Sequence, residues 1–501
     1  MRNLTLLLIA ALLIGAAPKS KDDKTVQTEH GMIGLGGEKA SEHTQHPDAQ
    51  WYPDAGLGLF LHYSICSVKA MNISWPMIPG RPLEAKRIED PAERERIIRE
   101  EDWDLKGKKP EITPNEYWAM AKEFNPTEYN PDKWLRAAKE AGFTYVVLTT
   151  RHHDGFALWP SKFGDFDTKN YMGGRDLVKE YVEACRKNGL KVGLYYSPPN
   201  WHFDRDYMSF LYYGGKNNPE FPSLDADLKP RTGKHTPEEI KQHQEEFAAL
   251  VKGQVEELLT NYGKIDLIWF DGKPAIPNGD KVITQERIRE LQPGIVINPR
   301  LHGKGDFVTY ERTLKTDKIA TSWAEFCNTW NSNWSYTKTP YKADGFVLAQ
   351  LAKARSLGIN YLLGIGPMAS GDLAPEAYEN MAVVAGWMKQ NGASIKGTRP
   401  LPKEERASVP ATASPQQRYL FATPEFKDHG TAESDILPAS ASDLTLKGLS
   451  AKPQAVKLLA DGSELKHDFA NGTLTVHLPA EKRSKLVDVV VIDLAPPAVG
   501  G

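Results

Sequence analysis

Seven polar residues stand at or near the ends of expected strands, and their chemistry suits the cleavage of a glycosidic bond. They are two carboxylates, three histidines, a tyrosine and an arginine: His62, His152, His153, Tyr195, Asp271, Arg300 and Glu311. Parallel α/β barrels carry their catalytic groups at the carboxyl ends of the strands, so these side chains are expected at one barrel mouth. Glycoside hydrolysis requires two carboxylates, one that attacks or stabilises the anomeric carbon and one that protonates the leaving oxygen.

Asp271 ends the most apolar of these strands, residues 265–272, which read IDLIWFDG. A run this apolar is typical of a strand that is buried on both faces. A carboxylate buried beside Trp269 and Phe270 without a partner would be destabilising, so Asp271 needs a reason. Positions 269 and 271 share one face of a strand, which places Trp269 beside Asp271 as an apolar wall for a sugar. An Asp that only caps the next turn is the plainer alternative.

The remaining residues also have structural interpretations. Adjacent residues on a regular strand point to opposite faces, so His152 and His153 do not predict a metal site, and no other His or acidic cluster has ligand spacing. His62 could be a core histidine, and Tyr195 could fill the barrel interior. Arg300 could pair with a structural acid, and Glu311 could lie on the surface.

The elements that position these residues alternate between strands and amphipathic helices. Strands are expected at residues 56–63, 144–150, 190–197, 265–270, 294–298 and 360–367, and a further stretch at residues 305–311 ends in Glu311. Helices are expected at residues 114–124, 131–141, 176–188, 236–262, 284–291, 345–357 and 375–391, with a short one near 91–101. This order favours a (β/α)8-like TIM barrel over an open sheet, because polar residues recur at nearly every strand end.

The composition changes along the chain predict four segments. Residues 1–17 are expected to be a signal peptide and residues 18–50 a polar, flexible lead-in, followed by the barrel over residues 51–400. Residues 401–501 are expected to form an antiparallel β-sandwich, because short β-rich runs alternate with turn residues there. Within the barrel, residues 76–113 and 200–235 are expected as loop excursions that shape the rim.

The first residues and the overall composition predict an exported protein with neither a membrane anchor nor a nucleic-acid partner. Arg2 precedes an apolar run at residues 4–15, which is too short to span a bilayer, and small residues follow it. The mature protein is therefore expected in the periplasm or outside the cell. The 501 residues carry a formal net charge of −3, which provides no basic field. Three cysteines fit neither a disulfide framework nor a zinc motif and are expected as buried thiols.

Several stretches resemble glycoside hydrolase family 29, the retaining α-L-fucosidases. They include LTTRHHDGFALWPSK at residues 148–162, GLYYSPP at 193–199, WFDG at 269–272 and NYLL at 360–363. The likeness runs continuously over residues 51–400, and the family's usual C-terminal β-sandwich would account for the rest. An HHDG-containing block followed by WFDG in this order is highly specific for the family.

The resemblance implies a role for each matching position. Asp271 would be the nucleophile that forms a covalent fucosyl-enzyme, kept ionised by nearby His or Arg side chains. Glu311 would be the acid/base, with Glu325 of the WAEFC segment as the second choice. The sugar's hydroxyls would be held, and its pocket lined, by His62, Trp75, His152, His153, Tyr195, Trp269 and Arg300. The substrate would be a fucosylated oligosaccharide or polysaccharide, and neither a metal nor an organic cofactor is implied.

Three departures from the family pattern leave the sugar open. Ser74 stands before Trp75 where many members have a Glu that binds sugar hydroxyls, Tyr63-Ser64 replaces Trp-Gly, and Gly364 replaces an Asn. Losing an acid that pairs with hydroxyls weakens that contact by about 1–3 kcal/mol if nothing replaces it. A sulfated fucan or an α-L-galactoside is therefore an alternative substrate. A non-catalytic carbohydrate-binding relative and a metal-dependent barrel hydrolase are further alternatives.

Overall fold

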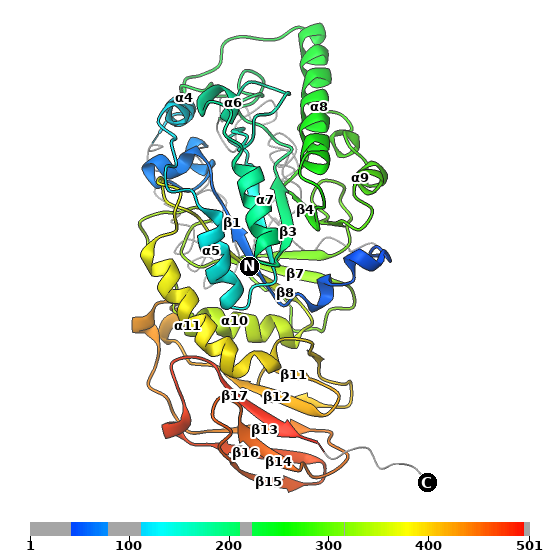
Figure 1. Cartoon of the computed structure of the whole chain (residues 1–501), viewed down its shortest axis with the longest axis vertical. Coiled ribbons are helices and arrows are strands. Elements are labelled where there is room, and N and C mark those ends of the chain that lie inside the picture. Colours follow the sequence, from blue (N-terminus) through cyan, green and yellow to red (C-terminus); the bar gives the residue numbers. More distant parts are fainter. Residues whose placement is uncertain (1–41, 79–111, 211–222, 315, 495–501) are drawn as a thin grey trace, which may run out of the picture.

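The computed structural model describes residues 42–78, 112–210, 223–314 and 316–494. The described chain forms a barrel domain and a smaller β-domain, with α10 (Asp344–Ser356) and α11 (Pro375–Asn391) between them (Figure 1). The predicted signal peptide, the short helix expected near 91–101 and part of each predicted rim excursion lie outside the described residues.

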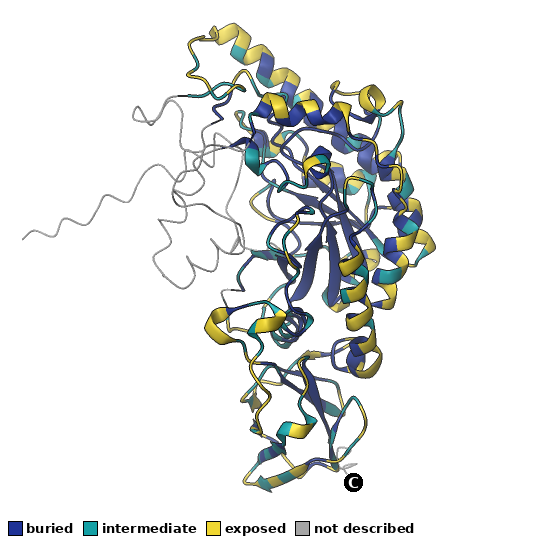
Figure 2. Cartoon of the chain, turned by 90° about the vertical axis from the view of Figure 1, so that its left-hand side faces the viewer, coloured by how far each residue is buried: buried dark blue, intermediate teal, exposed yellow. Residues whose placement is uncertain are grey.

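Eight parallel strands build the barrel sheet in the order β5-β4-β3-β2-β1-β8-β7-β6. Apolar and β-branched residues fill these strands, which are buried on both faces, as Figure 2 shows. The predicted barrel fold is confirmed. The strands are β1 Leu57–Leu61, β2 Tyr145–Arg151, β3 Lys191–Tyr196, β4 Leu267–Phe270, β5 Val296–Ile297, β6 Val308–Glu311, β7 Ala324–Thr329 and β8 Asn360–Ile365.

The strand β7 was not predicted, because its sequence AEFCNT alternates weakly and contains two strongly polar residues. It forms because β6 and β8 supply parallel partners on both sides. Its register with β6 pairs Thr309 with Glu325 and Glu311 with Cys327, which places the two glutamates two residues apart in depth.

The described barrel strands carry no ladder between β5 and β6. Two hydrogen bonds between Ile297 and Asp306 connect the two sides of this seam, the gap between β5 and β6. The Ile297 amide donates to Asp306 Oδ2 at 2.7 Å, and the Asp306 amide donates to the Ile297 carbonyl at 2.8 Å. Arg289 balances the buried Asp306 charge with an ion pair of 2.8 Å. Arg300 follows β5 and Glu311 ends β6, so the seam separates two of the predicted site residues.

The helices match the predicted ones to within a few residues at most ends, because the sequence carries clear start signals. Proline opens four of them, and Thr236 forms a capping box with Glu239 at the start of the long helix α8. The barrel helices are α4 Pro114–Ala119, α5 Pro131–Glu140, α6 Thr168–Tyr171, α7 Leu177–Lys187, α8 Pro237–Thr260 and α9 Gln285–Leu291, with α10 and α11 as given above.

The C-terminal domain is built from two antiparallel sheets, which confirms the predicted β-sandwich. One sheet has the order β14-β17-β12-β11-β9 and the other β10-β13-β16-β15. Leucine and valine side chains of both sheets share one core, while Phe421 and Val489 on the opposite face of the larger sheet join the barrel core. The strands are β9 Arg399–Pro400, β10 Arg406–Ala407, β11 Ala411–Ala413, β12 Gln417–Ala422, β13 Ser442–Lys447, β14 Ala455–Leu458, β15 Lys466–Ala470, β16 Thr473–Leu478 and β17 Asp488–Asp493.

Three smaller expectations bear on the described residues. Cys66, Cys185 and Cys327 are buried and unpaired, as expected. Residues 42–50, the last part of the predicted lead-in, lie against the barrel, where Ala49 is fully buried and His43 stacks on Trp323. Across the described ranges, no helix is long and apolar enough to cross a membrane.

Candidate active site

Asp271 lies at the mouth of the barrel because it directly follows strand β4. Its four residues are fully packed, and Asp271 is the first residue beyond its C-terminal end. Tyr195 on β3 is in register with Trp269, and the two rings stack with centroids 5.6 Å apart. The expected alternation holds, because Trp269 and Asp271 face the same pocket.

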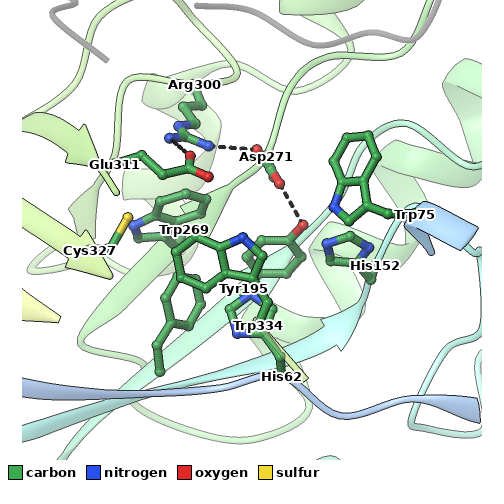
Figure 3. Close-up of a pocket in the computed structure, with 11 residues that line it drawn as sticks. His62, Trp75, His152, Tyr195, Trp269, Asp271, Arg300, Glu311, Cys327 and Trp334 are labelled. Carbon is green, nitrogen blue, oxygen red and sulfur yellow. Dashed lines mark hydrogen bonds and ion pairs between the residues drawn. The ribbon is translucent and has the colours of Figure 1, made fainter. Parts of the chain in front are cut away.

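The pocket at this mouth gathers most of the predicted site residues, as Figure 3 shows. Residues from β1, β3, β4, β6 and β7 and from the segments that follow barrel strands contribute to it. Its lining residues are Phe60, His62, Trp75, His152, Tyr195, Trp269, Asp271, Arg300, Glu311, Cys327 and Trp334. The two predicted residues outside this lining are His153, which contacts Asp271 from below the surface, and Glu325.

The Asp271 carboxylate is held at both oxygens. Arg300 Nη1 donates to Oδ1 at 2.9 Å, the Tyr195 hydroxyl donates to Oδ2 at 2.8 Å, and His153 Nε2 lies 3.4 Å from Oδ2. Burial raises the pKa of Asp271, but hydrogen bonding by His153 and the charge of Arg300 outweigh burial and leave the pKa well below its usual range. Asp271 is therefore an anion across the ordinary pH range, as a nucleophile requires.

Arg300 joins the two carboxylates of the pocket. Its second terminal nitrogen, Nη2, donates to Glu311 Oε2, so one guanidinium bridges Asp271 and Glu311 (Figure 3). The Arg300 side chain is almost fully buried and its guanidinium lies over the Trp269 ring at 4.6 Å. Burial lowers the pKa of Arg300, but the charges of Glu311 and Asp271 raise it further, so Arg300 stays a cation. The rigid fork of the guanidinium fixes the two carboxylates side by side.

Glu325, the second choice for the acid/base, does not reach the pocket. Its side chain is fully buried and accepts hydrogen bonds from Tyr145 at 2.7 Å, Trp269 Nε1 at 2.9 Å and Tyr52 at 3.2 Å. Burial raises the pKa of Glu325 despite these three donors. Cys327, two residues further along β7, lines the pocket instead. Glu325 therefore lies one layer of side chains below the site and supports Trp269.

Histidine rings line the opposite wall. His152 stacks on Tyr195 with centroids 5.4 Å apart and nearly parallel planes, and His62 lies 5.0 Å from Trp334. Burial lowers the pKa of His62 to about 3, so His62 is neutral and has one nitrogen that donates and one that accepts. Such a ring suits hydrogen bonding to a sugar hydroxyl without placing a charge beside Asp271.

Ser74 is fully buried and does not line the pocket. It has a left-handed conformation with φ of 59°. Its hydroxyl lies 2.6 Å from His152 Nδ1 and accepts from the Asp154 amide at 2.9 Å. The hydroxyl is thus committed to His152, and Ser74 adds no carboxylate to the pocket.

Phe60, Cys327 and Trp334 also line the pocket and were not among the predicted site residues. Phe60 could have been found, because it shares the strand parity of His62 and so the same face. Cys327 required strand β7 to be recognised. Trp334 lies in the irregular segment after β7, where no periodic pattern marks it, and its ring fills the space next to Gly364.

One group of residues in the described part of the chain has the spacing of a metal site. Ligand atoms of His152, His153 and Asp271 lie within 4.8 Å of one another. Both Asp271 oxygens already accept hydrogen bonds, and the adjacent Arg300 cation would repel a metal ion. We therefore interpret His153 as a partner of the carboxylate and His152, which is bonded to Ser74, as part of the pocket lining. The absence of a metal requirement stays a prediction.

The chain matches known proteins over most of its length. The model of the α-L-fucosidase family matches residues 37–393. Tissue α-L-fucosidase of Bos taurus is 26% identical over 370 residues, which cover 71% of this chain and 70% of that protein. The structure of α-L-fucosidase isoenzyme 1 from Paenibacillus thiaminolyticus is 27% identical with a TM-score of 0.66, and the match covers 90% of this chain and 99% of that one.

A third comparison concerns the fold. A family 29 α-L-fucosidase from Bacteroides thetaiotaomicron, trapped as a covalent intermediate, superposes with a TM-score of 0.66 at 23% identity. The match covers 92% of this chain and 99% of that one, so the barrel and the β-sandwich are shared. The family model, the curated relatives and the fold agree, and the chain belongs to the α-L-fucosidases, glycoside hydrolase family 29.

Proposed function

We propose that this protein is an exported, retaining exo-glycosidase that hydrolyses terminal α-L-fucosyl residues from glycans. The observation that carries the proposal is the pair of carboxylates, Asp271 and Glu311, held by the two ends of one guanidinium in a pocket lined by aromatic rings. Retaining enzymes need their two carboxyl groups about 5–5.5 Å apart, and partners of one guanidinium suit such a short separation better than the wider one of inverting enzymes.

In the first step, an Asp271 oxygen attacks the anomeric carbon while Glu311 gives its proton to the leaving oxygen. The glycosidic C–O bond breaks, the alcohol leaves, and the fucosyl residue is esterified to Asp271. In the second step, Glu311 removes a proton from water, the water oxygen attacks the anomeric carbon, and the ester bond breaks. Fucose leaves with its original anomeric configuration, and both carboxylates return to their starting states.

The contacts of the two carboxylates support Asp271 as the nucleophile and Glu311 as the acid/base. Asp271 receives hydrogen bonds at both oxygens and stays ionised, which suits the nucleophile. Glu311 has one cationic partner and a side chain that is 15% exposed, so it can exchange protons with the pocket. The second step needs ionised Glu311, because Glu311 then removes a proton from water.

The buried rings that line the pocket support exo action. Trp269, Tyr195 and His62 are among its lining residues, and their side chains are buried in the barrel. Aromatic faces bind the apolar face of a sugar ring, and the polar groups beside them can hold its hydroxyls. A single terminal residue suits a pocket walled by such buried rings, whereas a continuous polysaccharide chain would need a cleft that is open at both sides.

A nucleophile variant tests the proposal directly. The Asp271→Gly variant should lose turnover of an aryl α-L-fucoside, and azide should partly restore it and give a fucosyl azide of inverted configuration, because no covalent intermediate forms. Product configuration is measured by proton NMR. Full activity of this variant, or a rescued product of retained configuration, would contradict the mechanism. A non-catalytic carbohydrate-binding protein would show no turnover in the wild type.

A sulfated fucan or an α-L-galactoside is the second candidate substrate. The observation that favours it is Ser74, whose hydroxyl is engaged by His152 and the Asp154 amide, so no acid stands at that position. Assays of aryl α-L-fucoside, aryl α-L-galactoside and sulfated fucan fragments side by side decide between them. If the plain aryl fucoside is turned over as well as any analogue, the second candidate is wrong.

Export is proposed from the N-terminal pattern alone, in which a basic residue, an apolar run and small residues follow one another. The test is expression of the full chain in a bacterial host, followed by cell fractionation and N-terminal sequencing. A product that begins near residue 18 outside the cytoplasm supports export. An uncleaved cytoplasmic product contradicts it.

A further inference from the structure

The His153 ring stands between a serine and the proposed nucleophile. Its Nδ1 lies 2.6 Å from Ser197 Oγ, and its Nε2 lies 3.4 Å from Asp271 Oδ2. Trp201 stacks on the ring at 5.0 Å and Trp75 contacts it edge-on at 5.6 Å, so the fully buried ring has a fixed orientation. The two nitrogens therefore meet different chemical environments.

The proton on Nδ1 follows from counting the protons of Ser197. The Ser197 hydroxyl lies 2.7 Å from the Pro199 carbonyl oxygen, and a carbonyl can only accept. A hydroxyl has one proton, so Ser197 donates to Pro199 and must accept from His153. The His153 ring consequently carries a proton on Nδ1.

This assignment has a consequence at Nε2. A neutral ring with its proton on Nδ1 would direct the Nε2 lone pair at the Asp271 carboxylate, and two electron-rich atoms at 3.4 Å repel each other. A second proton on Nε2 turns the same contact into an ion pair. Tyr195, which donates to the same Asp271 oxygen, cannot remove this conflict because its proton is already in use.

We propose that Ser197 is a positioning residue that fixes the proton of His153 on Nδ1, so that the ring takes a second proton on Nε2 while Asp271 is ionised and releases it when Asp271 is glycosylated. The second half rests on the proposed function. When the anomeric carbon bonds to Asp271, the carboxylate charge is lost in the ester, and the Nε2 proton leaves to solvent. Hydrolysis of the ester restores the charge and the proton returns.

Several ionisable groups surround this ring and set the balance. Asp271 lies 3.4 Å from Nε2, and Asp154 is the next residue along the chain. The Arg300 cation on the far side of Asp271 opposes the second proton, while His152, at a centroid distance of 4.2 Å, and the neutral His62 lie nearby. Loss of the Asp271 charge removes the main favourable contribution, so the second proton is released.

Neutron crystallography of the deuterated wild-type enzyme tests the proton positions. The free enzyme should show deuterium on both Nδ1 and Nε2 of His153, and the enzyme trapped with a 2-fluoro-fucosyl fluoride should show it on Nδ1 alone. Deuterium on only one nitrogen in the free enzyme would overturn the proposal. The free-enzyme result needs no turnover, so it decides the proton assignment even if the proposed function is wrong.

Kinetics of the Ser197→Ala variant test the positioning role. We use an aryl fucoside with a 2,4-dinitrophenyl leaving group, which needs no proton from Glu311, so the alkaline limb of kcat/KM does not reflect proton loss from Glu311. The wild type should lose activity on this limb. In the variant a neutral ring can place its single proton on Nε2, so the limb should flatten, while the plateau falls about 10- to 100-fold through loss of a hydrogen bond to a charged group.

The matched control is Ser161→Ala, which removes another fully buried serine hydroxyl. The Ser161 hydroxyl donates to Glu257 at 2.7 Å, and neither residue lines the pocket. The pH profile of Ser161→Ala should equal that of the wild type. An alkaline limb of the Ser197→Ala variant identical to that of the wild type would overturn the proposal. A variant that does not fold leaves the neutron experiment to decide.

Discussion

Two glutamates stand on adjacent strands of the barrel, Glu311 at the end of β6 and Glu325 near the start of β7. Glu311 faces the pocket, is 15% exposed and shares Arg300 with Asp271. Glu325 is fully buried and has three uncharged donors around it, from two tyrosines and a tryptophan. The two carboxyl groups differ in depth by one layer of side chains, because Glu311 pairs in register with Cys327 rather than with Glu325.

This difference in depth separates a reactive acid from a structural one. A carboxyl at the mouth can exchange a proton with substrate and water, whereas one beneath it can only accept hydrogen bonds from the barrel interior. We call the pocket residues around Glu311 and Arg300 the upper layer, and the buried residues around Glu325 the lower layer. Trp269 links the two layers, since its indole nitrogen donates to Glu325 while its ring lies under Arg300 in the pocket. The lower layer thus holds the upper one in place.

The largest expected difference between the layers is in catalysis. The Glu311→Ala variant should lose about 10²- to 10⁴-fold in kcat/KM on a fucoside with a poor leaving group, because general acid catalysis is lost. It should lose much less with a 2,4-dinitrophenyl leaving group, and azide should give a product of retained configuration. The Glu325→Gln variant should respond equally to both substrates. If Glu325→Gln rather than Glu311→Ala shows the leaving-group dependence and the azide product, the roles are exchanged.

Arg300 belongs to the upper layer and should show the next largest effect. The Arg300→Met variant removes a charge that lowers the pKa of Asp271, so the acid limb of kcat/KM should move to higher pH. The loss at neutral pH should be about 10- to 100-fold, the value of one hydrogen bond to a charged group. The Arg300→Lys variant keeps the charge but not the fork, so it should shift the limb less and still lose activity. An unshifted acid limb in Arg300→Met would show that Asp271 does not depend on Arg300.

Glu325 should act on stability rather than on chemistry. Burial raises the pKa of Glu325 above its value in the unfolded chain, so folding takes up a proton between the two values. This contribution to stability is fully present below the unfolded pKa, near 4.5, and is lost as pH rises toward the folded pKa. The Glu325→Gln variant does not titrate, so its Tm relative to the wild type should rise with pH above about 4.5.

The Tm of the variant must be compared with that of the wild type at each pH. Burial raises the pKa of Asp344 to about 7, and this makes the stability of both proteins depend on pH in a similar way. A Tm difference that is constant from pH 4 to 8 would show that folding does not raise the pKa of Glu325. The Glu325→Ala variant is the harsher change, because it leaves three buried donors unpaired at a cost of about 1–3 kcal/mol each.

The smallest expected effect concerns metal removal. Dialysis against a chelator should leave kcat/KM unchanged, because Arg300 and Tyr195 already bind Asp271 and the two adjacent histidines have serine partners. The measurement is activity together with elemental analysis before and after dialysis. Activity that disappears with a bound metal and returns on its addition would support a metal-dependent hydrolase instead.

The parts of the fold that were predictable have local signals. Helix α8 begins where Thr236 and Pro237 predict, and β4 is the apolar run before Asp271. Strand β7 was missed because tertiary pairing, rather than its own residues, makes it a strand. Four strands of the smaller domain, β12, β14, β16 and β17, match the β-rich runs of the sequence at residues 418–423, 455–459, 473–478 and 487–492. The charged edge strand β15 has no comparable apolar signal.

The site was predictable where strand ends determine it. Asp271, Tyr195 and His152 follow from that rule, and the structure brings them together. Depth within the barrel does not appear in the sequence, since Glu311 and Glu325 are both acids near strand residues and only the register of β6 with β7 separates them. The bonds of Ser74 and Ser197 to the two histidines were also hidden, because they join segments far apart in the chain.

The assignment of the two carboxylates is tested most directly by trapping the covalent intermediate with a 2-fluoro-fucosyl fluoride in the Glu311→Gln variant and mapping the label by peptide mass spectrometry. We expect one fucosyl residue per chain on the peptide that contains Asp271, and the label should also form when Glu325 is replaced by Gln. A label on any other carboxylate, or active enzyme that never becomes labelled, would contradict the two-carboxylate mechanism.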